Sequence, residues 1–326
     1  MQSKRLNSDF DGRPAGPRIG IALGSGSARG WAHVGVIRAL QEIGITPHIV
    51  AGSSIGSIVG AAYALDRLEV LEEWVLCLNT SKIIKFFDPS LLRGGGMIQG
   101  EKLYEFAQGF VQDTRIESLP RSFAAVATDL ENGREVWFRE GPLLDAVSAS
   151  IALPGLFSPR RLNGRWLVDG GLTNPVPVSV CRAMGADVII AVNLNGDILG
   201  KHTRQRRKQT TPGHTNGGNE ADFLDRISSK LKHSLSESTE ELWYELVGED
   251  PDTPGMFEVL ASSINIMQDR ITRSRMGGDP PEVMLSPHLA ELGLMDFDRA
   301  ETAIAEGRAE VQRMRPVLEQ VLHDAG

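Results

Sequence analysis

A serine between two glycines is the strongest chemical signal in the chain. Gly52-Ser53-Ser54-Ile55-Gly56 follows the apolar run 49–51 and precedes an apolar run of small residues that ends near residue 65. A G-x-S-x-G pattern at a strand-to-helix turn projects the hydroxyl of its serine from a strained turn, where only glycines fit two positions away. The positive end of the following helix favours developing negative charge. Ser54 is therefore a candidate nucleophile, although a buried turn that happens to contain serine fits the motif equally well.

A glycine-rich loop precedes this turn by one predicted strand-and-helix unit. Gly24-Ser25-Gly26-Ser27-Ala28-Arg29-Gly30 lies between the apolar strand 18–23 and the helical pattern 31–43. A dinucleotide site is one interpretation, but Arg29 stands where its fingerprint needs a third glycine, and no acidic residue is well placed about twenty residues on. An oxyanion hole is another, because glycines let backbone N–H groups face a substrate oxygen. A plain strand–helix turn is the third.

An aspartate at the end of a strand is the candidate base. Asp169-Gly170-Gly171 follows the predicted strand 165–168. By itself, Asp-Gly is more typical of an ordinary turn. Free aspartate has a pKa near ~3.9, so it is a poor proton acceptor unless a dry pocket raises that value. An alcohol nucleophile needs such a neighbouring base.

Composition limits the class of protein. The 326 residues are 41% hydrophobic and 23% charged, which fits a soluble globular chain, and the net charge of −8 argues against nucleic-acid binding. Cys77 and Cys181 form no disulfide framework or metal spacing, which favours a reducing compartment. Residues 1–17 have no apolar signal core and are predicted to be a mobile tail. Residues 49–65 carry no charge, but we interpret them as strand plus buried helix, not as a membrane span.

The pattern along the chain predicts alternating strands and helices. The opening is strand, loop, helix, strand, turn, helix, with both loops at the carboxyl edge of a parallel sheet. Residues 196–222 are predicted to be a mobile insertion; their five Lys and Arg within 201–208 offer a weaker alternative, contact with anionic lipid. A helix over 256–276 is expected to carry an apolar stripe that faces the core or a dimer partner, an interpretation that we favour over insertion into lipid. The members of that stripe are Leu260, Ile264, Met267 and Ile271.

Taken in order, the three motifs resemble the patatin-like phospholipase family, in the bacterial branch that is similar to RssA proteins and to the catalytic domain of neuropathy target esterase. The resemblance covers roughly residues 19–195. It implies a three-layer α/β/α sandwich with a mostly parallel central sheet. It also implies a catalytic domain over 18–195 and a mainly helical C-terminal extension over 223–326, packed on the same domain.

The resemblance also assigns roles to residues. It implies a Ser–Asp dyad in which Ser54 is the nucleophile and Asp169 the base, with Gly26, Ser27 and Arg29 in the oxyanion-hole segment and no metal or cofactor. The glycines that complete the motifs are Gly24, Gly30, Gly52, Gly56, Gly170 and Gly171. Many relatives carry glycine at the positions of Ser25 and Ser27, and serine is less permissive at positive φ. We expect Arg29 to brace the loop or pair with a carboxylate.

The implied activity is that of a carboxylic ester hydrolase acting through an acyl-enzyme. Its substrates would be phospholipids, lysophospholipids or other fatty acyl esters, and the protein would be cytoplasmic, with peripheral contact at the inner membrane. A homodimer through the helices of 223–276 is a further expectation. One alternative is a Ser-His-Asp esterase that uses His288 or His323. Others are a non-catalytic membrane-surface module and a nucleotide-dependent oxidoreductase.

Overall fold

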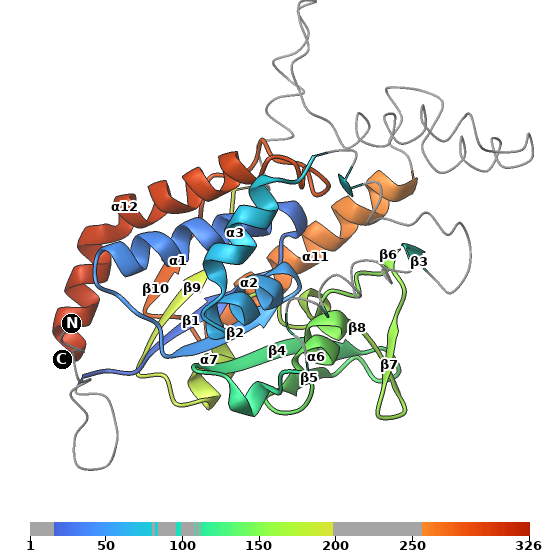
Figure 1. Cartoon of the computed structure of the whole chain (residues 1–326), viewed down its shortest axis with the longest axis horizontal. Coiled ribbons are helices and arrows are strands. Elements are labelled where there is room, and N and C mark those ends of the chain that lie inside the picture. The colour runs from blue at the N-terminus through green and yellow to red at the C-terminus, as the bar shows by residue number, and fades with distance from the viewer. Residues whose placement is uncertain are drawn as a thin grey trace, which may run out of the picture.

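A central β-sheet with helices on both faces organises the protein. The computed structural model describes residues 16–79, 82–83, 96–98, 108, 111, 113–197 and 256–326. Within these residues the main sheet has eight strands in the spatial order β10-β9-β1-β2-β4-β8-β7, and β5 also pairs with β4 (Figure 1). The strands are β1 (Ile19–Leu23), β2 (Ile49–Ser53), β4 (Ser122–Asp129), β5 (Glu135–Phe138), β7 (Arg160–Leu162), β8 (Arg165–Asp169), β9 (Val188–Val192) and β10 (Val283–Leu285). A second, two-stranded sheet pairs β3 (Gly96–Ile98) with β6 (Gly155–Phe157).

The sheet is mostly parallel, as expected from the family resemblance. Strands β10, β9, β1, β2 and β4 run parallel, whereas β5 and β8 run antiparallel to β4, and β7 antiparallel to β8. Leu23 pairs with Gly52, so the loops that follow β1 and β2 leave the same edge of the sheet. The five residues of β1, β2 and β9 are all buried, because helices cover both faces of the sheet.

Two helical layers enclose this sheet. The largest apolar cluster includes residues of α1, α2, α3, α6 and α12, and a second cluster lies on the opposite face with α7 and the end of α11. The helices are α1 (Ala32–Glu42), α2 (Ile55–Ala64), α3 (Leu68–Leu76), α6 (Leu143–Ser150), α7 (Val178–Ala183), α11 (Met256–Gly278) and α12 (Ala300–Ala325). Short 3-10 turns are η1 (Ser27–Trp31), η2 (Ile116–Ser118) and η3 (Gly170–Leu172). The three-layer α/β/α arrangement with a helical C-terminus is confirmed.

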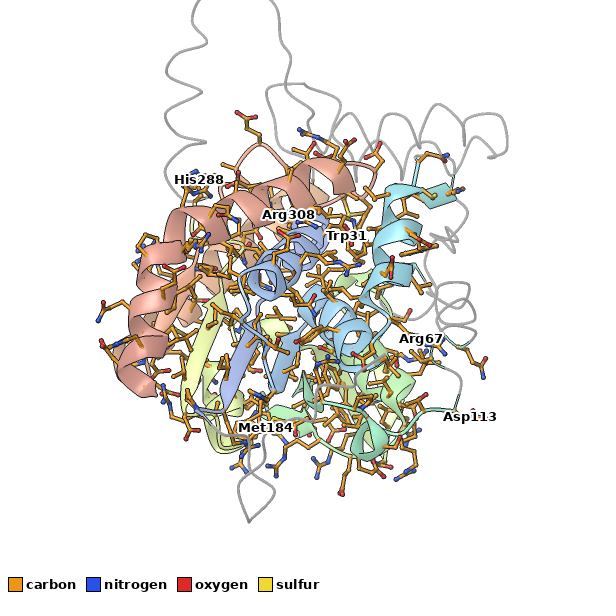
Figure 2. The ribbon with its side chains drawn as sticks, turned by 60° about the vertical axis from the view of Figure 1, so that its left-hand side comes forward. Trp31, Arg67, Asp113, Met184, His288 and Arg308 are labelled. Carbon is orange, nitrogen blue, oxygen red and sulfur yellow. The ribbon has the colours of Figure 1, made fainter. Side chains whose placement is uncertain are left out.

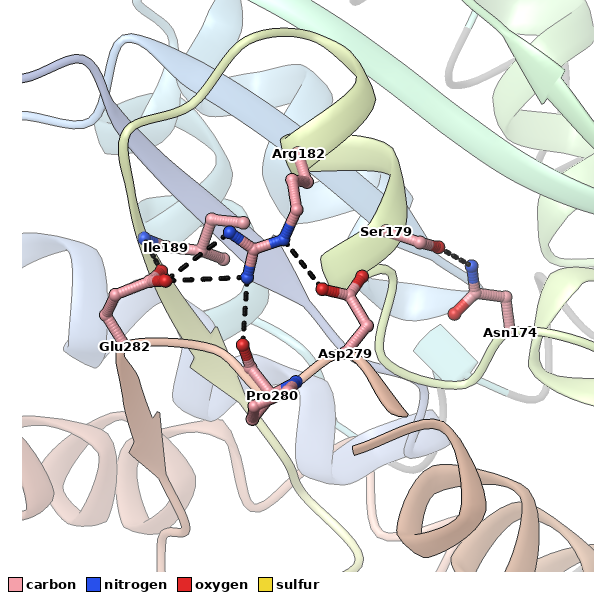
Figure 3. A network of polar contacts seen from close by, with 7 residues as sticks. All are labelled: Asn174, Ser179, Arg182, Ile189, Asp279, Pro280 and Glu282. Atoms are coloured by element: carbon pink, nitrogen blue, oxygen red, sulfur yellow. Dashed lines mark hydrogen bonds and ion pairs between the residues drawn. The ribbon is translucent and has the colours of Figure 1, made fainter. Parts of the chain in front are cut away.

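The C-terminal part of the chain is joined to the sheet by strand pairing and by charge. β10 pairs with β9, and the linker between α11 and β10 binds one guanidinium (Figure 3). Arg182 of α7 donates from Nε to Asp279 Oδ1 at 2.6 Å and from Nη2 to the carbonyl oxygen of Pro280 at 2.8 Å. The N–H of Ile189 in β9 donates to Glu282 Oε2 at 2.7 Å. These contacts fix α11 and β10 relative to the strands that carry the candidate site.

The buried face of α11 differs from the predicted stripe. Leu260 is 40% exposed and Met267 is 48% exposed. The side chains that α11 buries are those of Ile264, Gln268, Asp269 and Thr272. The core-facing interpretation is therefore wrong for Leu260 and Met267, because this part of the helix covers polar loops at the edge of the sheet, where the partners are hydrogen-bonding groups. The dimer-facing interpretation stays a prediction.

Several expectations fall outside the described residues. Residues 1–15 of the predicted tail 1–17, the basic run 201–208 and most of the insertion 196–222 are among them. The division of the chain into domains, the homodimer and the lipid contact of the insertion therefore stay predictions. No helix in the described part of the chain is both long enough and apolar enough to cross a bilayer. The uncharged run 49–65 folds as β2 followed by α2.

Candidate active site

Ser54 occupies the strained turn that its motif predicts. It lies between β2 and α2 with φ 55° and ψ −128°, a conformation that L-residues rarely adopt. A side chain at Gly52 would place its Cβ 2.4 Å from the carbonyl oxygen of Gly56, and one at Gly56 would place it 2.2 Å from that of Leu23. Gly52 therefore lets the turn close onto the start of α2, and Gly56 lets it pack against β1.

Two serines hold the backbone of this turn. The N–H of Ser54 donates to Ser150 Oγ at 3.0 Å, and Ser57 Oγ donates to the carbonyl oxygen of Ser54 at 2.7 Å. Ser150, at the end of α6, is fully buried. The strained conformation is thus fixed from both sides, which keeps the direction of the Ser54 side chain constant.

The structure brings Ser54 and Asp169 into direct contact. Ser54 Oγ donates to Asp169 Oδ2 at 2.5 Å, across 115 positions of sequence. The contact depends on strand direction: β8 runs antiparallel to β4, so Asp169 at its end pairs with Ala127, one residue beyond the Val126 that pairs with Ser53. Asp169 therefore reaches the end of β2 from β8, which is separated from β2 in the sheet by β4.

Asp169 is held in place by its backbone and its second carboxylate oxygen. Oδ1 accepts from the N–H of Gly171 at 2.7 Å, and the Asp169 carbonyl oxygen accepts from Thr128 Oγ1 at 2.9 Å. Its own N–H donates to the carbonyl oxygen of Ala152 at 2.9 Å. A side chain at Gly170 would place its Cβ 2.1 Å from the carbonyl oxygen of Val126, so this motif glycine permits a close approach to β4.

Burial changes the acidity of this carboxyl group. Asp169 has no solvent-accessible surface, and burial raises its pKa from about 3.8 to about 7. The hydrogen bonds from Ser54 and Gly171 favour the charged form and oppose this rise without cancelling it. A carboxylate with a pKa near neutrality accepts a proton from an alcohol far better than an exposed aspartate does.

The glycine-rich loop lies directly against the Ser54 turn. A Cβ at Gly30 would lie 2.1 Å from the side chain of Ile55, and a Cβ at Gly24 would lie 2.6 Å from the carbonyl oxygen of Val192. Ser27 adopts φ 51°, the left-handed conformation that glycine would take at no cost. Ser27 therefore adopts the backbone conformation that is typical of glycine at this position of the loop.

The backbone donors of this loop divide into bound and available groups. The N–H groups of Ser25 and Ala28 donate to the carbonyl oxygens of Pro175 and Leu294, at 2.8 and 3.1 Å, and that of Arg29 donates to Gly26 at 3.2 Å. Within the described residues, the N–H groups of Gly26 and Ser27 have no backbone acceptor. These two are the donors that a substrate oxygen could use.

Arg29 braces the loop. The side chain is 3% exposed, and its Nε donates to the carbonyl oxygen of Leu292 at 2.8 Å. Nη1 donates to Asn195 Oδ1 at 3.4 Å. Because its N–H and its guanidinium are both engaged within the protein, Arg29 supports the oxyanion-hole segment and does not itself offer a donor from the backbone.

Comparison with known proteins shows the family to which the chain belongs. A family model for patatin-like phospholipases matches residues 21–182. An uncharacterized NTE family protein of Mycobacterium tuberculosis (strain H37Rv) is 35% identical over 325 residues, which covers 90% of this chain and 90% of that protein. The patatin-like phospholipase domain-containing protein 6 of Mus musculus is 33% identical over 188 residues, 55% of this chain and 14% of that protein. The chain belongs to the patatin-like phospholipase family.

The histidines of this patatin-like chain do not build a triad in the described structure. His288 lies exposed on the outside of the molecule beside α12 (Figure 2), and the side chain of His323 is 87% exposed. His33 is fully buried, and its Nε2 donates to the carbonyl oxygen of Gly24 at 2.8 Å. Burial lowers the pKa of His33 to about 4, so it stays neutral and supports the glycine-rich loop.

Three site-supporting residues were missed by sequence reasoning. Ser150 holds the Ser54 turn, while Asn195 and Gln268 lie beneath the glycine-rich loop. Asn195 gave a usable signal, because it follows β9 at the same edge of the sheet as the other loops. Gln268 gave a weaker one, a polar residue four positions after Ile264 on a helix predicted to bury that residue. Nothing around Ser150 in the sequence points to Ser54.

Proposed function

We propose that this protein is a serine hydrolase that cleaves fatty acyl esters of phospholipids or lysophospholipids through a Ser54–Asp169 dyad. The coarser statement, that it hydrolyses lipid esters, follows from the patatin-like phospholipase family. The observation that carries the finer one is the 2.5 Å hydrogen bond from Ser54 Oγ to a fully buried carboxylate. Burial of a carboxyl group costs free energy, and so does the strained conformation of Ser54. Proton transfer between the two groups is a function that would account for both costs.

The proposed acylation step needs only groups of this chain. Ser54 Oγ attacks the ester carbonyl carbon while its proton moves to Asp169 Oδ2. The carbonyl oxygen becomes an oxyanion and accepts from the N–H groups of Gly26 and Ser27. When the tetrahedral intermediate collapses, the alcohol leaves with the proton from Asp169, and the acyl group remains esterified to Ser54.

Deacylation repeats the same steps with water. Asp169 takes a proton from the attacking water, and the new oxyanion uses the same two donors. Collapse of the second intermediate releases the fatty acid and returns the proton to Ser54 Oγ. Each step conserves charge and protons without an added co-reactant.

Variants of the dyad test this proposal. We expect Ser54→Ala to lower kcat for p-nitrophenyl butyrate by about a thousandfold or more, since the nucleophile is lost, and Asp169→Asn to be nearly as damaging. Folding should persist, as judged by circular dichroism. His288→Ala and His323→Ala are the matched controls and should keep wild-type rates. Hydrolysis by purified Ser54→Ala at the wild-type rate would refute the dyad, and loss of activity in either histidine variant would favour a triad.

Labelling separates this enzyme from a non-catalytic module. A fluorophosphonate probe should modify the wild-type protein at Ser54, as located by peptide mass spectrometry, and should leave Ser54→Ala unlabelled. An inert Ser54 in the wild-type protein would support the binding-module alternative. Incubation of both proteins with mixed phospholipids, followed by mass spectrometry of the released lipids, would then identify the acyl chain and head group.

A further inference from the structure

A cluster of buried polar side chains lies beneath the candidate oxyanion hole. Ser25, Arg29, Asn195 and Gln268 are each between 2% and 4% exposed. They come from the loop after β1, the turn after β9 and the middle of α11. Buried polar groups persist in a fold only when hydrogen bonds satisfy them, so this cluster is a built feature of the site edge.

The hydrogen bonds of the cluster converge on one amide. Gln268 Oε1 accepts from Ser25 Oγ at 3.0 Å and from Asn195 Nδ2 at 3.0 Å. Asn195 Nδ2 also donates to the carbonyl oxygen of Ser25 at 3.4 Å. Ser25 therefore binds α11 through its hydroxyl and Asn195 through its carbonyl oxygen. The same carbonyl group forms the peptide bond to the nitrogen of Gly26, the first available donor of the loop.

The direction of these hydrogen bonds is set by Arg29. A guanidinium can only donate, so the Asn195 atom that faces Arg29 Nη1 must be Oδ1. The other end of the Asn195 amide is then a donor, and the Gln268 atom that faces it must be Oε1. The charged side chain of Arg29 thus orients the amide of Asn195, which in turn orients the amide of Gln268. Gln268 Oε1 is therefore the atom that accepts from the Ser25 hydroxyl.

The cluster also contacts the aspartate motif. A Cβ at Gly171 would lie 2.5 Å from Gln268 Nε2, 2.9 Å from Ser25 Oγ and 3.0 Å from Asp169 Oδ1. Any side chain at Gly171 would force these groups apart. Gln268 is therefore packed between the loop that offers the oxyanion donors and the residue that orients Asp169.

We propose that Gln268 is a positioning residue, which through Ser25 sets the place of the Gly26 and Ser27 N–H groups relative to Ser54. This inference rests on the proposed hydrolase function. It assigns a role in the site to α11, which lies outside the residues 21–182 matched by the family model. The physical reason is that oxyanion donors act only when held in advance at the correct distance, and an error of about 1 Å can lower a rate by about a hundredfold.

The primary test is Gln268→Met, which keeps side-chain length but removes both hydrogen-bonding groups. We expect kcat for p-nitrophenyl butyrate to fall by about tenfold or more, with KM within about twofold of wild type, and the rate of fluorophosphonate labelling to fall in parallel. Thr272→Val is the matched control. Thr272 lies one turn further along α11 and is also 4% exposed, yet within the described structure it has no hydrogen bond to the loop. We expect this control to keep wild-type kcat.

Ser25→Ala gives an independent route if the α11 variant folds poorly. It removes only the hydroxyl that donates to Gln268, and it should lower kcat in the same way. The double variant Gln268→Met with Ser25→Ala should be no slower than the slower single variant, because both remove the same hydrogen bond. Additive losses would overturn the proposal, as would wild-type kcat in either folded single variant or an equal loss in Thr272→Val.

Asn195→Asp tests the direction of the hydrogen bonds. A carboxylate still accepts from Arg29, but it can donate neither to Gln268 Oε1 nor to the carbonyl oxygen of Ser25, so both contacts through which Asn195 holds the loop should be lost. A tenfold or greater fall in kcat, without a change in melting temperature beyond that of Thr272→Val, would support the proposal; an unchanged kcat would contradict it.

If wild-type protein and Ser54→Ala are equally inactive on every ester, the proposed function itself fails. If the wild-type protein is active and Ser54→Ala is not, the kcat of Gln268→Met tests only the positioning role of Gln268.

Discussion

The buried carboxyl group of Asp169 combines a proposed role as the base with a cost to the stability of the fold. Burial raises the pKa of Asp169 to about 7, above the value near ~3.9 expected in the unfolded chain. Between these two values the folded state binds more protons than the unfolded state, so the free energy of unfolding decreases as pH rises through this range. Asp169 thus lowers stability in its ionised form, which is the form that the proposed mechanism needs. This is a common compromise where a site needs a perturbed pKa.

The pH dependence of hydrolysis should report this shift. Asp169 must be ionised to accept a proton from Ser54, so we expect kcat/KM for p-nitrophenyl butyrate to rise with pH and to level off above about 7. A pH–rate profile of the purified protein, corrected for spontaneous ester hydrolysis, measures the midpoint. A limb with its midpoint near 4, the value of an exposed aspartate, would contradict the buried base.

Glycines decide how closely the elements approach one another. Helices α1 and α12 cross at a point where both backbones nearly touch: a Cβ at Gly35 would lie 1.9 Å from the carbonyl oxygen of Ile304, and one at Gly307 would lie 2.0 Å from that of Ala32. Because these neighbours are backbone atoms, they cannot move aside without displacing a helix. α1 begins immediately after η1, so this contact also limits the movement of the glycine-rich loop.

Substitution at this crossing should be costly. We expect Gly307→Ala to lower the free energy of unfolding by ~2 kcal/mol or more, because the added methyl group meets the backbone of α1. Gly277→Ala is the matched control: it lies near the end of α11 with nothing within 4 Å of an added Cβ, and alanine there should be neutral or stabilising by up to about 1 kcal/mol. Urea unfolding of both variants gives the comparison. Similar midpoints for the two would disprove the close crossing.

At the scale of the whole molecule, the C-terminal part of the chain completes the site. Arg29 and Ala28 bind the carbonyl oxygens of Leu292 and Leu294. α11 supplies Gln268, β10 pairs with β9, and α12 covers α1. The segment that matches the family model contains the proposed nucleophile and base. Residues beyond that segment position the loop that the substrate oxygen would meet in the proposed mechanism.

Truncation tests this division of labour. A chain that ends at residue 197 keeps the whole matched segment but exposes the buried side of α1 and the edge of β9. We expect it to lose cooperative thermal unfolding and ester hydrolysis, as measured by calorimetry and by release of p-nitrophenol. A chain that lacks residues 1–15 serves as the control and should match the full-length protein. A truncated chain that is monomeric, cooperative and active would show that the C-terminal contacts are dispensable.

Local patterns were enough to predict the elements that carry the motifs. The turn at Ser54, its flanking glycines and the strands on either side of it follow from short-range sterics and hydrophobicity, which act within a few residues. The polar buried face of α11 could not be predicted in this way. Its apolar residues gave a helical period, but the orientation of the helix depends on what it covers, and the loops it covers come from segments far away in the sequence.

By itself, then, the amino-acid sequence determined a parallel α/β core, a strained serine and a glycine-rich loop at one edge of a sheet. Only the tertiary structure decided that β8 runs antiparallel to β4 and brings Asp169 to Ser54, that burial raises the pKa of this aspartate, and that Gln268 faces the loop. The reason is that strand direction, burial and helix orientation are settled by contacts between distant segments, and no local pattern contains them.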